Sequence, residues 1–530
     1  SNVWAGSAGT FADGTGRWMA SGRRGFLEIV LAFAEDEEES SGEDQTIRYW
    51  DVFGKIDYDL TPSQSLSLQV LGAEDTLDFD ETEDDERAAI DTSYGNNYVW
   101  ATHQALLGPE TFVNTLASIG RIDRDRVALI TEEIPPESID IRDVRDTEVL
   151  SLRQDWGHQL GDRHFLKWGF EARRWDVTYD YRNEAGLADP IDDPRFLPGD
   201  RLTEFAADHS GEQYALYAAE RTRFGGSLTA ELGLRWDRQT LTDEDTVSPR
   251  VNLVYDLGSG GVLRAGWGHF HQSQRPYELA VEFGETEFQQ AARAEHFILG
   301  YENLIGQYRV RADVFRRDIT DPHVRYETLF DPFNIFPEAR TDLVVLPAEA
   351  ASADGVELSL RAPTKPKLNW WVTYSLSSVE DELDGRAVKR SIDQTHAVTA
   401  SLSWRPSRKW NLSWVWLHHT GWPTTPLSAE ATLTPDDQIV LDYDVGEFYS
   451  DRFNDYQRLD FRASRTTEVG KDGTLTFFID VQNLLNQENE RGIELNDAEY
   501  TFLPDGSLEV DFPVDDWLPI LPSFGVIWEF

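Results

Sequence analysis

Cysteine is absent from this chain of 530 residues, and methionine occurs once. The lack of cysteine excludes a disulfide scaffold, a thiolate metal site and a cysteine nucleophile. No run of about 18 apolar residues is present, which excludes a membrane-spanning helix. Basic residues are also few, with 48 Lys and Arg against 96 Asp and Glu, so the sequence lacks the basic footprint of a nucleic-acid-binding protein.

What the sequence has instead is a regular alternation of apolar and polar residues. In segment 228–237 every second residue is apolar, and similar patterns return at 250–257, 308–315, 368–377 and 475–482. Successive side chains of a strand point to opposite faces, so each segment predicts a strand with one apolar and one polar face. The hydrophobic share of 40% is too high for a disordered acidic chain.

The connections between these segments fall into two classes. Short connections rich in Gly, Pro, Asp and Ser are typical of hairpin turns, and they occur at 13–16, 160–162, 258–260, 406–408 and 470–473. Long and mostly acidic connections occur at 35–45, 78–87, 181–209, 272–293, 326–352 and 420–454. Because short and long connections take turns, we expect antiparallel strands with all long loops at one end.

About 21 strands with their connections use up the chain, so we expect one β-domain over residues 1–530. An open sheet of that size has unpaired edges, whereas a closed barrel removes them. The alternative is a soluble all-β protein such as a propeller or tandem sandwiches, because alternation also fits a half-buried strand.

Three features favour a barrel in lipid. The apolar faces are long enough for the ~9–11 residues of a tilted membrane-crossing strand. The opposite faces carry charges in strand after strand, as a wet lumen requires. Trp and Tyr lie near the strand ends, where amphipathic rings meet lipid headgroups. The sequence therefore predicts an all-β fold, a transmembrane antiparallel β-barrel.

Several short segments, in this order along the chain, resemble the barrel of TonB-dependent outer-membrane receptors. They are LGLRWD at 232–237, VSPRVNLVY at 247–255, LRAGWG at 263–268, ADVFRRDI at 312–319, DQTH at 393–396 and VQNLLN at 481–486. The last strand, with Trp528 and a terminal Phe530, is similar to the C-terminal assembly signal of bacterial outer-membrane barrels.

The resemblance implies a barrel of the 22-strand type, a plug domain in its lumen and a TonB-box peptide ahead of the plug. No plug-like segment is recognisable in this chain, for which we expect the barrel with long acidic extracellular loops. If Phe530 lies at the periplasmic side, the odd number of strands makes the first strand of this chain, segment 3–11, run toward the periplasm. This segment would then correspond to the second strand of the family. The first strand and the plug would then lie on a separate chain, be cleaved off, or be absent. Direct pairing of segment 3–11 with the last strand would contradict this interpretation.

No catalytic constellation stands out, so an enzyme is not expected. Ligand capture is assigned to aromatic loop residues, because aromatic anchors dominate recognition, and self-packing of the loops is the alternative for each of them. These candidates are Phe330, Phe333, Phe336, Trp422, Phe448 and Tyr449. A second set is expected to face the lumen as an electrostatic wall: Lys167, Arg173, Arg235, Arg264, Arg309, Arg311, Arg361 and Arg462.

No metal or cofactor site is assigned. His418 and His419 are adjacent, and adjacent strand residues point to opposite faces, so they do not predict a shared metal ion. The acidic runs 35–39 and 81–86 are interpreted as solvated loops adapted to high salt, with Ca²⁺ binding as the alternative. Their spacing matches no defined calcium loop.

The sequence thus predicts a TonB-dependent receptor barrel that takes up a scarce nutrient, such as a siderophore, cobalamin, a saccharide or a peptide. A plugless passive pore and a structural barrel that docks partner proteins are the alternatives. The expected partners are outer-membrane lipid, a plug on a separate or cleaved chain, the TonB energy-coupling machinery and a surface protein, but no nucleic acid. The expected location is the outer membrane of a Gram-negative type of cell.

Overall fold

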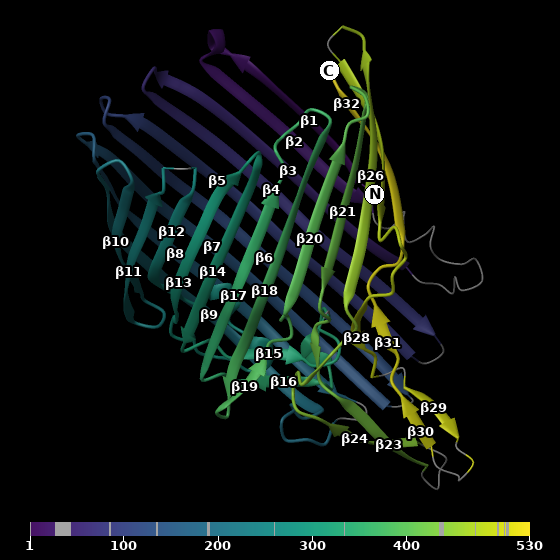
Figure 1. Cartoon of the computed structure of the whole chain (residues 1–530). Helices are drawn as coiled ribbons and strands as arrows, with labels where there is room; N and C mark the ends of the chain where they lie inside the picture. Colours follow the sequence, from purple (N-terminus) through teal and green to yellow (C-terminus); the bar gives the residue numbers. More distant parts are fainter. Residues whose placement is uncertain are drawn as a thin grey trace.

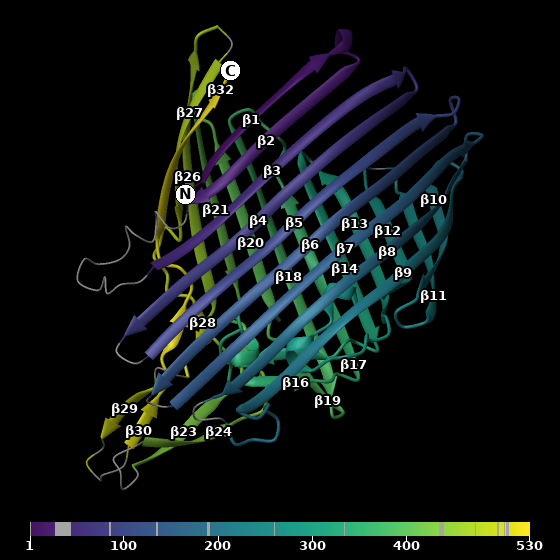
Figure 2. The ribbon, with the colours of Figure 1, turned by 180° about the vertical axis from the view of Figure 1, so that it is seen from behind.

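One large antiparallel sheet dominates the computed structural model (Figures 1 and 2). The structure describes residues 2–26, 44–83, 86–133, 136–187, 191–258, 260–332, 334–433, 439–471, 473–495, 498–502, 504 and 508–530. Within these ranges the sheet has 22 strands, of which β19 (Arg386–Lys389) is a short arm that pairs only with the end of β18. The other 21 form the wall of a barrel, which confirms the predicted fold class.

The wall strands follow one another in chain order, each hydrogen-bonded to the next. They are β1 (Asn2–Phe11), β2 (Gly16–Phe26), β3 (Asp44–Thr61), β4 (Gln64–Glu83), β5 (Glu86–Leu106), β6 (Thr111–Glu133), β7 (Pro136–Leu160), β8 (His164–Gly186), β9 (Asp200–Phe224), β10 (Leu228–Gln239), β11 (Glu244–Asp256), β12 (Val262–Gln272), β13 (Ala292–Ile305), β14 (Tyr308–Thr320), β17 (Ala350–Arg361), β18 (Leu368–Leu383), β20 (His396–Trp404), β21 (Trp410–His419), β26 (Tyr456–Val469), β27 (Gly473–Gln482) and β32 (Leu521–Glu529).

The outer face of the wall is apolar because the register keeps the apolar positions of neighbouring strands in line. Val251 on β11 lies opposite Trp267 on β12, which lies opposite Phe297 on β13. Leu299 and Val314 continue the same face on β13 and β14 and are 57% and 52% exposed. Large apolar side chains with exposed fractions this high need lipid around them, and the outer face of an outer-membrane barrel is surrounded by lipid.

The strands on one side of the barrel are far longer than a bilayer requires. Strands β3 to β9 have 18 to 25 residues, whereas about 9–11 residues cross the hydrocarbon core. Figure 2 shows them as long tilted arrows in purple and blue. Their far ends therefore project beyond the membrane as a continuation of the wall.

Two of the predicted long loops are largely strand, and the prediction was wrong there. Segment 78–87 continues β4 to Glu83 and resumes β5 at Glu86. In segment 181–209, residues 181–186 and 200–209 are strand, and residues 188–190 lie outside the described residues. In β8 the buried Tyr179 and Tyr181 alternate with exposed charged residues, so the strand pattern persists although its outer face is charged.

The other long connections that the structure describes lie at one end, as predicted, and contain small elements of their own, whereas residues 35–43 lie outside the described residues. The extra strands are β15 (Arg325–Thr328), β16 (Leu343–Leu346), β22 (Pro423–Thr424), β23 (Leu427–Leu433), β24 (Ile439–Val445), β25 (Asp451–Arg452), β28 (Glu490–Ile493), β29 (Glu499–Phe502), β30 (Leu508–Asp511) and β31 (Val514–Asp516). The 3-10 turns are η1 (Ala12–Gly14), in the short β1–β2 connection, and η2 (Pro276–Glu278), η3 (Val281–Phe283) and η4 (Pro337–Ala339) in the long ones. No helix in the described ranges has the length and apolar character needed to cross a bilayer.

The wall has one seam. In the part of the chain that the structure describes, ladders run from β1 to β32 without a break, but none joins β32 to β1. Because the number of wall strands is odd, β1 and β32 run in the same direction. One strand antiparallel to both therefore fits between them, and segment 3–11 does not pair with the last strand.

Candidate functional site

The long connections fold together over one end of the barrel. We call the described residues of connections 187–199, 273–291, 321–349, 420–455 and 483–520 the cap. Figure 1 shows these segments gathered at the end of the wall opposite to the short turns. The cap is tied to the wall by arginine residues on the inner face of β6, β7 and β9.

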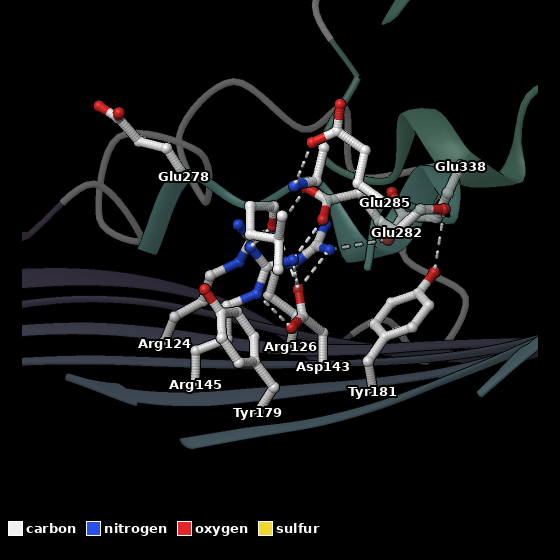
Figure 3. A network of polar contacts seen from close by, with 12 residues as sticks. Arg124, Arg126, Asp143, Arg145, Tyr179, Tyr181, Glu278, Glu282, Glu285 and Glu338 are labelled. Atoms are coloured by element: carbon white, nitrogen blue, oxygen red, sulfur yellow. Dashed lines mark hydrogen bonds and ion pairs between the residues drawn. The ribbon is translucent and has the colours of Figure 1, made fainter. Parts of the chain in front are cut away.

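The first tie joins β6 and β7 to η4. Arg126 on β6 donates from Nη2 to Asp143 Oδ2 on β7 and to Glu338 Oε1 on η4, and both distances are 2.7 Å. Its Nη1 donates to the carbonyl oxygen of Ile335 at 2.8 Å. Figure 3 shows these side chains converging between the sheet and the cap. All three charged groups are buried, so the contact depends on their mutual compensation.

The second tie joins β7 to η3. Arg145 contacts Asp143 Oδ1 from Nε at 2.8 Å, forms an ion pair with Glu282, and donates from Nη1 to the Leu279 carbonyl at 3.1 Å. Arg124 lies 3.0 Å from Asp143 Oδ2 and 3.7 Å from Glu282 Oε1.

The two ties together bring three arginines against three carboxylates. The cluster is therefore balanced in charge when all six groups are ionised. A balanced cluster tolerates burial, whereas the removal of one member leaves an uncompensated buried charge.

A third tie comes from β9. Arg201 donates from Nη1 to the Glu338 carbonyl at 2.8 Å and from Nη2 to the Arg340 carbonyl at 2.9 Å. These carbonyl groups lie within η4 and directly after it, so Arg201 fixes the backbone of the same turn whose Glu338 side chain binds Arg126.

Apolar packing surrounds the ion cluster. Tyr179 and Tyr181 on β8 pack with Leu279, Val281 and Phe336 of the cap in one buried cluster. The Tyr179 hydroxyl donates to the Pro276 carbonyl. The polar ties thus lie in an environment with little water, where they are stronger than on a surface.

The cap also has a hydrophobic core of its own. Connections that are far apart in the sequence contribute to it, with Phe196, Phe330, Val344, Tyr449 and Leu495 among its members. A core built from several connections makes the cap a folded unit, in contrast to a set of independent loops.

Besides Glu338, two further ionisable groups of the cap are buried. Burial raises the pKa of the Asp342 carboxyl, which accepts the Phe330 amide at 2.8 Å and lies 3.3 Å from Arg340 Nε. Burial also raises the pKa of the Tyr449 phenol, and the neighbouring Glu327 adds to the shift. Tyr449 therefore remains protonated and donates its hydroxyl to Glu327 Oε2 at 2.5 Å.

The aromatic residues proposed for ligand capture lie within the cap. Phe330, Phe336 and Tyr449 are at most 4% exposed and belong to its two apolar clusters. Phe448 carries the Arg195 guanidinium 4.8 Å from its ring centroid, and the ring of Trp422 lies 4.5 Å from that of His419. Phe333 lies outside the described residues. In this arrangement the rings serve loop packing, and their role in ligand capture stays a prediction.

The register places the eight basic residues expected in the lumen on the face opposite to the apolar one. Most form ion pairs with carboxylates of the same face. The pairs are Lys167–Glu231, Arg173–Glu171, Arg235–Asp237, Arg264–Glu302, Arg309–Glu302, Arg311–Asp313 and Arg462–Asp480. Arg361 lies directly across from Arg309 in the β14–β17 ladder.

The other singled-out residues are spread over the molecule. Trp528 and Phe530 are 63% and 92% exposed on and just after β32, with ring centroids 4.9 Å apart, and their role in assembly stays a prediction. His418 stacks on Trp416, whereas His419 stacks on Tyr456, its partner on the neighbouring strand β26, so the two imidazoles do not share a site.

Calcium binding by the acidic runs stays untested. Run 35–39 lies outside the described residues, and so do residues 84–85 of the second run. Elsewhere in the described chain, no group of three or more His, Asp or Glu has the arrangement of a metal site.

Sequence reasoning missed the arginine ties. Arg124 and Arg126 alternate along β6 with outward-facing residues, a signal that places them in the lumen. Nothing local links Arg126 to Glu338, which lies 212 positions away. The connection 483–520 was also not recognised as a long loop, although it contributes to the cap core.

Comparison with known proteins identifies the family. The family model described as TonB dependent receptor-like, beta-barrel matches residues 4–484. The chain belongs to this family. Its members are receptors that transport a ligand and interact with TonB, not enzymes.

Solved structures with the TonB-dependent receptor fold share little sequence with this receptor barrel. The ferripyoverdine receptor of the outer membrane of Pseudomonas aeruginosa is 13% identical, with a TM-score of 0.64 over 99% of this chain and 70% of that chain. The FrpB iron transporter from Neisseria meningitidis is 13% identical, with a TM-score of 0.60 over 99% and 79%. The siderophore receptor PiuA from Acinetobacter baumannii is 11% identical, with a TM-score of 0.63 over 99% and 79%. A search of curated proteins finds no match.

Proposed function

We propose that this receptor barrel takes up an iron-loaded siderophore across a Gram-negative outer membrane. The single observation that carries the proposal is the folded cap, which is anchored to the inner wall by Arg126, Arg145 and Arg201. A folded cap that a buried ion cluster holds over the mouth obstructs free passage, which favours a receptor over an open passive pore. Several structural neighbours are described as siderophore or iron receptors, which supports iron as the nutrient.

The seam between β1 and β32 supports a further part of the proposal. Both edges are unpaired in the described chain and run in the same direction. We infer that one additional strand, linked to a plug domain, occupies the seam and that the plug couples to TonB. The strand and plug belong either to a separate polypeptide or to a segment outside the present sequence.

Uptake of radioactive iron tests the proposal. Cells that lack the gene are given a panel of ⁵⁵Fe-loaded siderophores, with and without the complementing gene. We expect gene-dependent uptake of at least one chelate, and loss of that uptake in a tonB-deficient strain. Uptake that persists without TonB, together with large steady conductance of the purified protein in a planar bilayer, would identify a passive pore instead.

A further inference from the structure

A row with two arginines and a histidine crosses the inner wall below the cap. Arg250 on β11 lies opposite Gly268 on β12, Gly268 lies opposite His296 on β13, and His296 lies opposite Arg317 on β14. These four positions form one rung of the sheet and share the face that carries Arg126 and Asp143. At the usual strand spacing, the two arginines are about 14 Å apart along the rung, with His296 between them.

The side chain of Arg250 leans along this rung toward His296. Its guanidinium lies 4.4 Å from the ring centroid of Phe270 on β12, and that ring lies 4.4 Å from the ring of His296. Gly268 permits this path, because a Cβ there would lie 3.0 Å from Arg250 Cγ and 3.1 Å from the Pro249 carbonyl oxygen. Arg250 and His296 therefore both contact the same aromatic ring.

The two arginines of the row have no ion partner of their own in the described chain. Neither Arg250 nor Arg317 forms an ion pair there, and the Nε of Arg250 is buried without a hydrogen-bond acceptor. The nearby carboxylate of Asp237 is paired with Arg235. Carboxylates are not scarce in a chain with a net charge of −48. Most other cations on the inner face form an ion pair with a carboxylate, as Arg235, Arg264 and Arg311 do.

Arg462 provides the direct comparison. Its guanidinium lies 4.1 Å from the ring centroid of Phe478, an arrangement like that of Arg250 on Phe270. Arg462 also has Asp480 as an ion partner at 2.8 Å. The arginine–aromatic pair at Arg462 therefore has an anionic partner, whereas the similar pair at Arg250 has none among the described residues.

We propose that Arg250, His296 and Arg317 form a binding site for an oxyanion, the carboxylate or phosphate group of a small ligand in the lumen. The planar guanidinium presents paired donors that match two oxygens of such a group, and burial strengthens the contact. His296 adds a ring nitrogen between the two arginines. Arg317 is exposed, which gives a ligand access from the lumen.

Isothermal titration of the purified chain in detergent tests the site, with inorganic phosphate and citrate as probes. We expect saturable binding of at least one probe to the wild-type protein. The affinity falls tenfold or more in Arg250→Gln and in Arg317→Gln, and it stays within twofold in the matched control Arg462→Gln. Heat-modifiable migration on gels verifies that each variant is folded.

Three results would overturn the proposal. They are no binding of either probe to folded wild-type protein, equal binding by all variants, and loss of binding in Arg462→Gln to the same degree. Loss of binding on addition of chloride that follows the ionic strength alone would also count against a built site, because salt screens every exposed charge alike.

Discussion

Arg126 and Asp143 face each other from neighbouring strands with 2.7 Å between Nη2 and Oδ2, and both are almost fully excluded from solvent. The same guanidinium nitrogen holds Glu338 of the cap. One side chain therefore connects the wall to a loop that is 212 residues away in sequence. This relationship makes the closed cap depend on a few charges that can be changed one at a time.

Arg126→Ala should open the cap and leave the barrel intact. The substitution leaves Glu338 buried without its ion partner and removes one of the three arginines that contact Asp143. Removal of one partner from a buried pair costs about 3–5 kcal/mol. Limited proteolysis of connections 273–291 and 321–349 measures the opening, and heat-modifiable migration on gels measures the barrel. We expect new cleavage in these connections with unchanged migration.

The control for this variant lies on the opposite face of β7. Arg142 is 53% exposed and lies 3.3 Å from the exposed Asp180. A surface pair of this kind contributes less than ~1 kcal/mol, so Arg142→Ala should leave the protease pattern unchanged. Equal cleavage in both variants would show that the buried cluster does not hold the cap.

The wall could be predicted from the sequence, because alternation is a local signal that survives in every strand. The positions of the short turns followed from their Gly, Pro and Asp residues. The long strands β4, β5, β8 and β9 were cut short in the prediction, since charges on the outer face of a strand above the membrane look like loop composition. Leu77 and Phe79, which alternate with Asp78 and Asp80, are the signal that was available there.

The cap could not be predicted in the same way. Its core joins Phe196, Phe330, Tyr449 and Leu495, which come from four separate connections. Each connection alone is too short and too polar to fold, so only their convergence on one end of the barrel gives them a common interior. Its aromatic residues looked like ligand anchors because an isolated loop offers no other partner for them.

Phe330→Ala should loosen the cap core without touching the ion cluster. Phe330 is fully buried, and truncation of a buried Phe costs about 3–5 kcal/mol. Ile335 is 44% exposed in the same connection, so Ile335→Ala should change stability by less than ~0.5 kcal/mol. Hydrogen exchange of the Val344 and Leu346 amides reads out the difference. Protection that is equal in the two variants would contradict a shared core.

Asp342 should make the stability of the cap depend on pH. Its pKa is raised in the folded state, so the folded cap binds the proton more tightly than the unfolded cap does. The stabilisation is complete below the ordinary Asp pKa of about 3.9 and is lost as the pH rises through the raised folded value. Asp342→Asn removes this titration, so its protease resistance should decline less with rising pH than that of the wild type. Parallel pH profiles of the two proteins would exclude this role for Asp342.

Adjacent residues on β20 should differ strongly in how the same substitution changes the free energy of unfolding. Leu402 lies opposite Trp370 and Trp414 on the apolar face, whereas Ser401 lies opposite Trp371 and Val415 on the inner face. Leu402→Arg places a charge in lipid, which costs up to ~2–4 kcal/mol near the middle of the bilayer and less toward its surfaces. Ser401→Arg places the same charge in the polar lumen and should leave stability nearly unchanged. Urea unfolding in lipid vesicles compares the two variants. The reverse order of stability would mean that the face that carries Leu402 meets protein or water, and the assignment of the outer face would then be wrong.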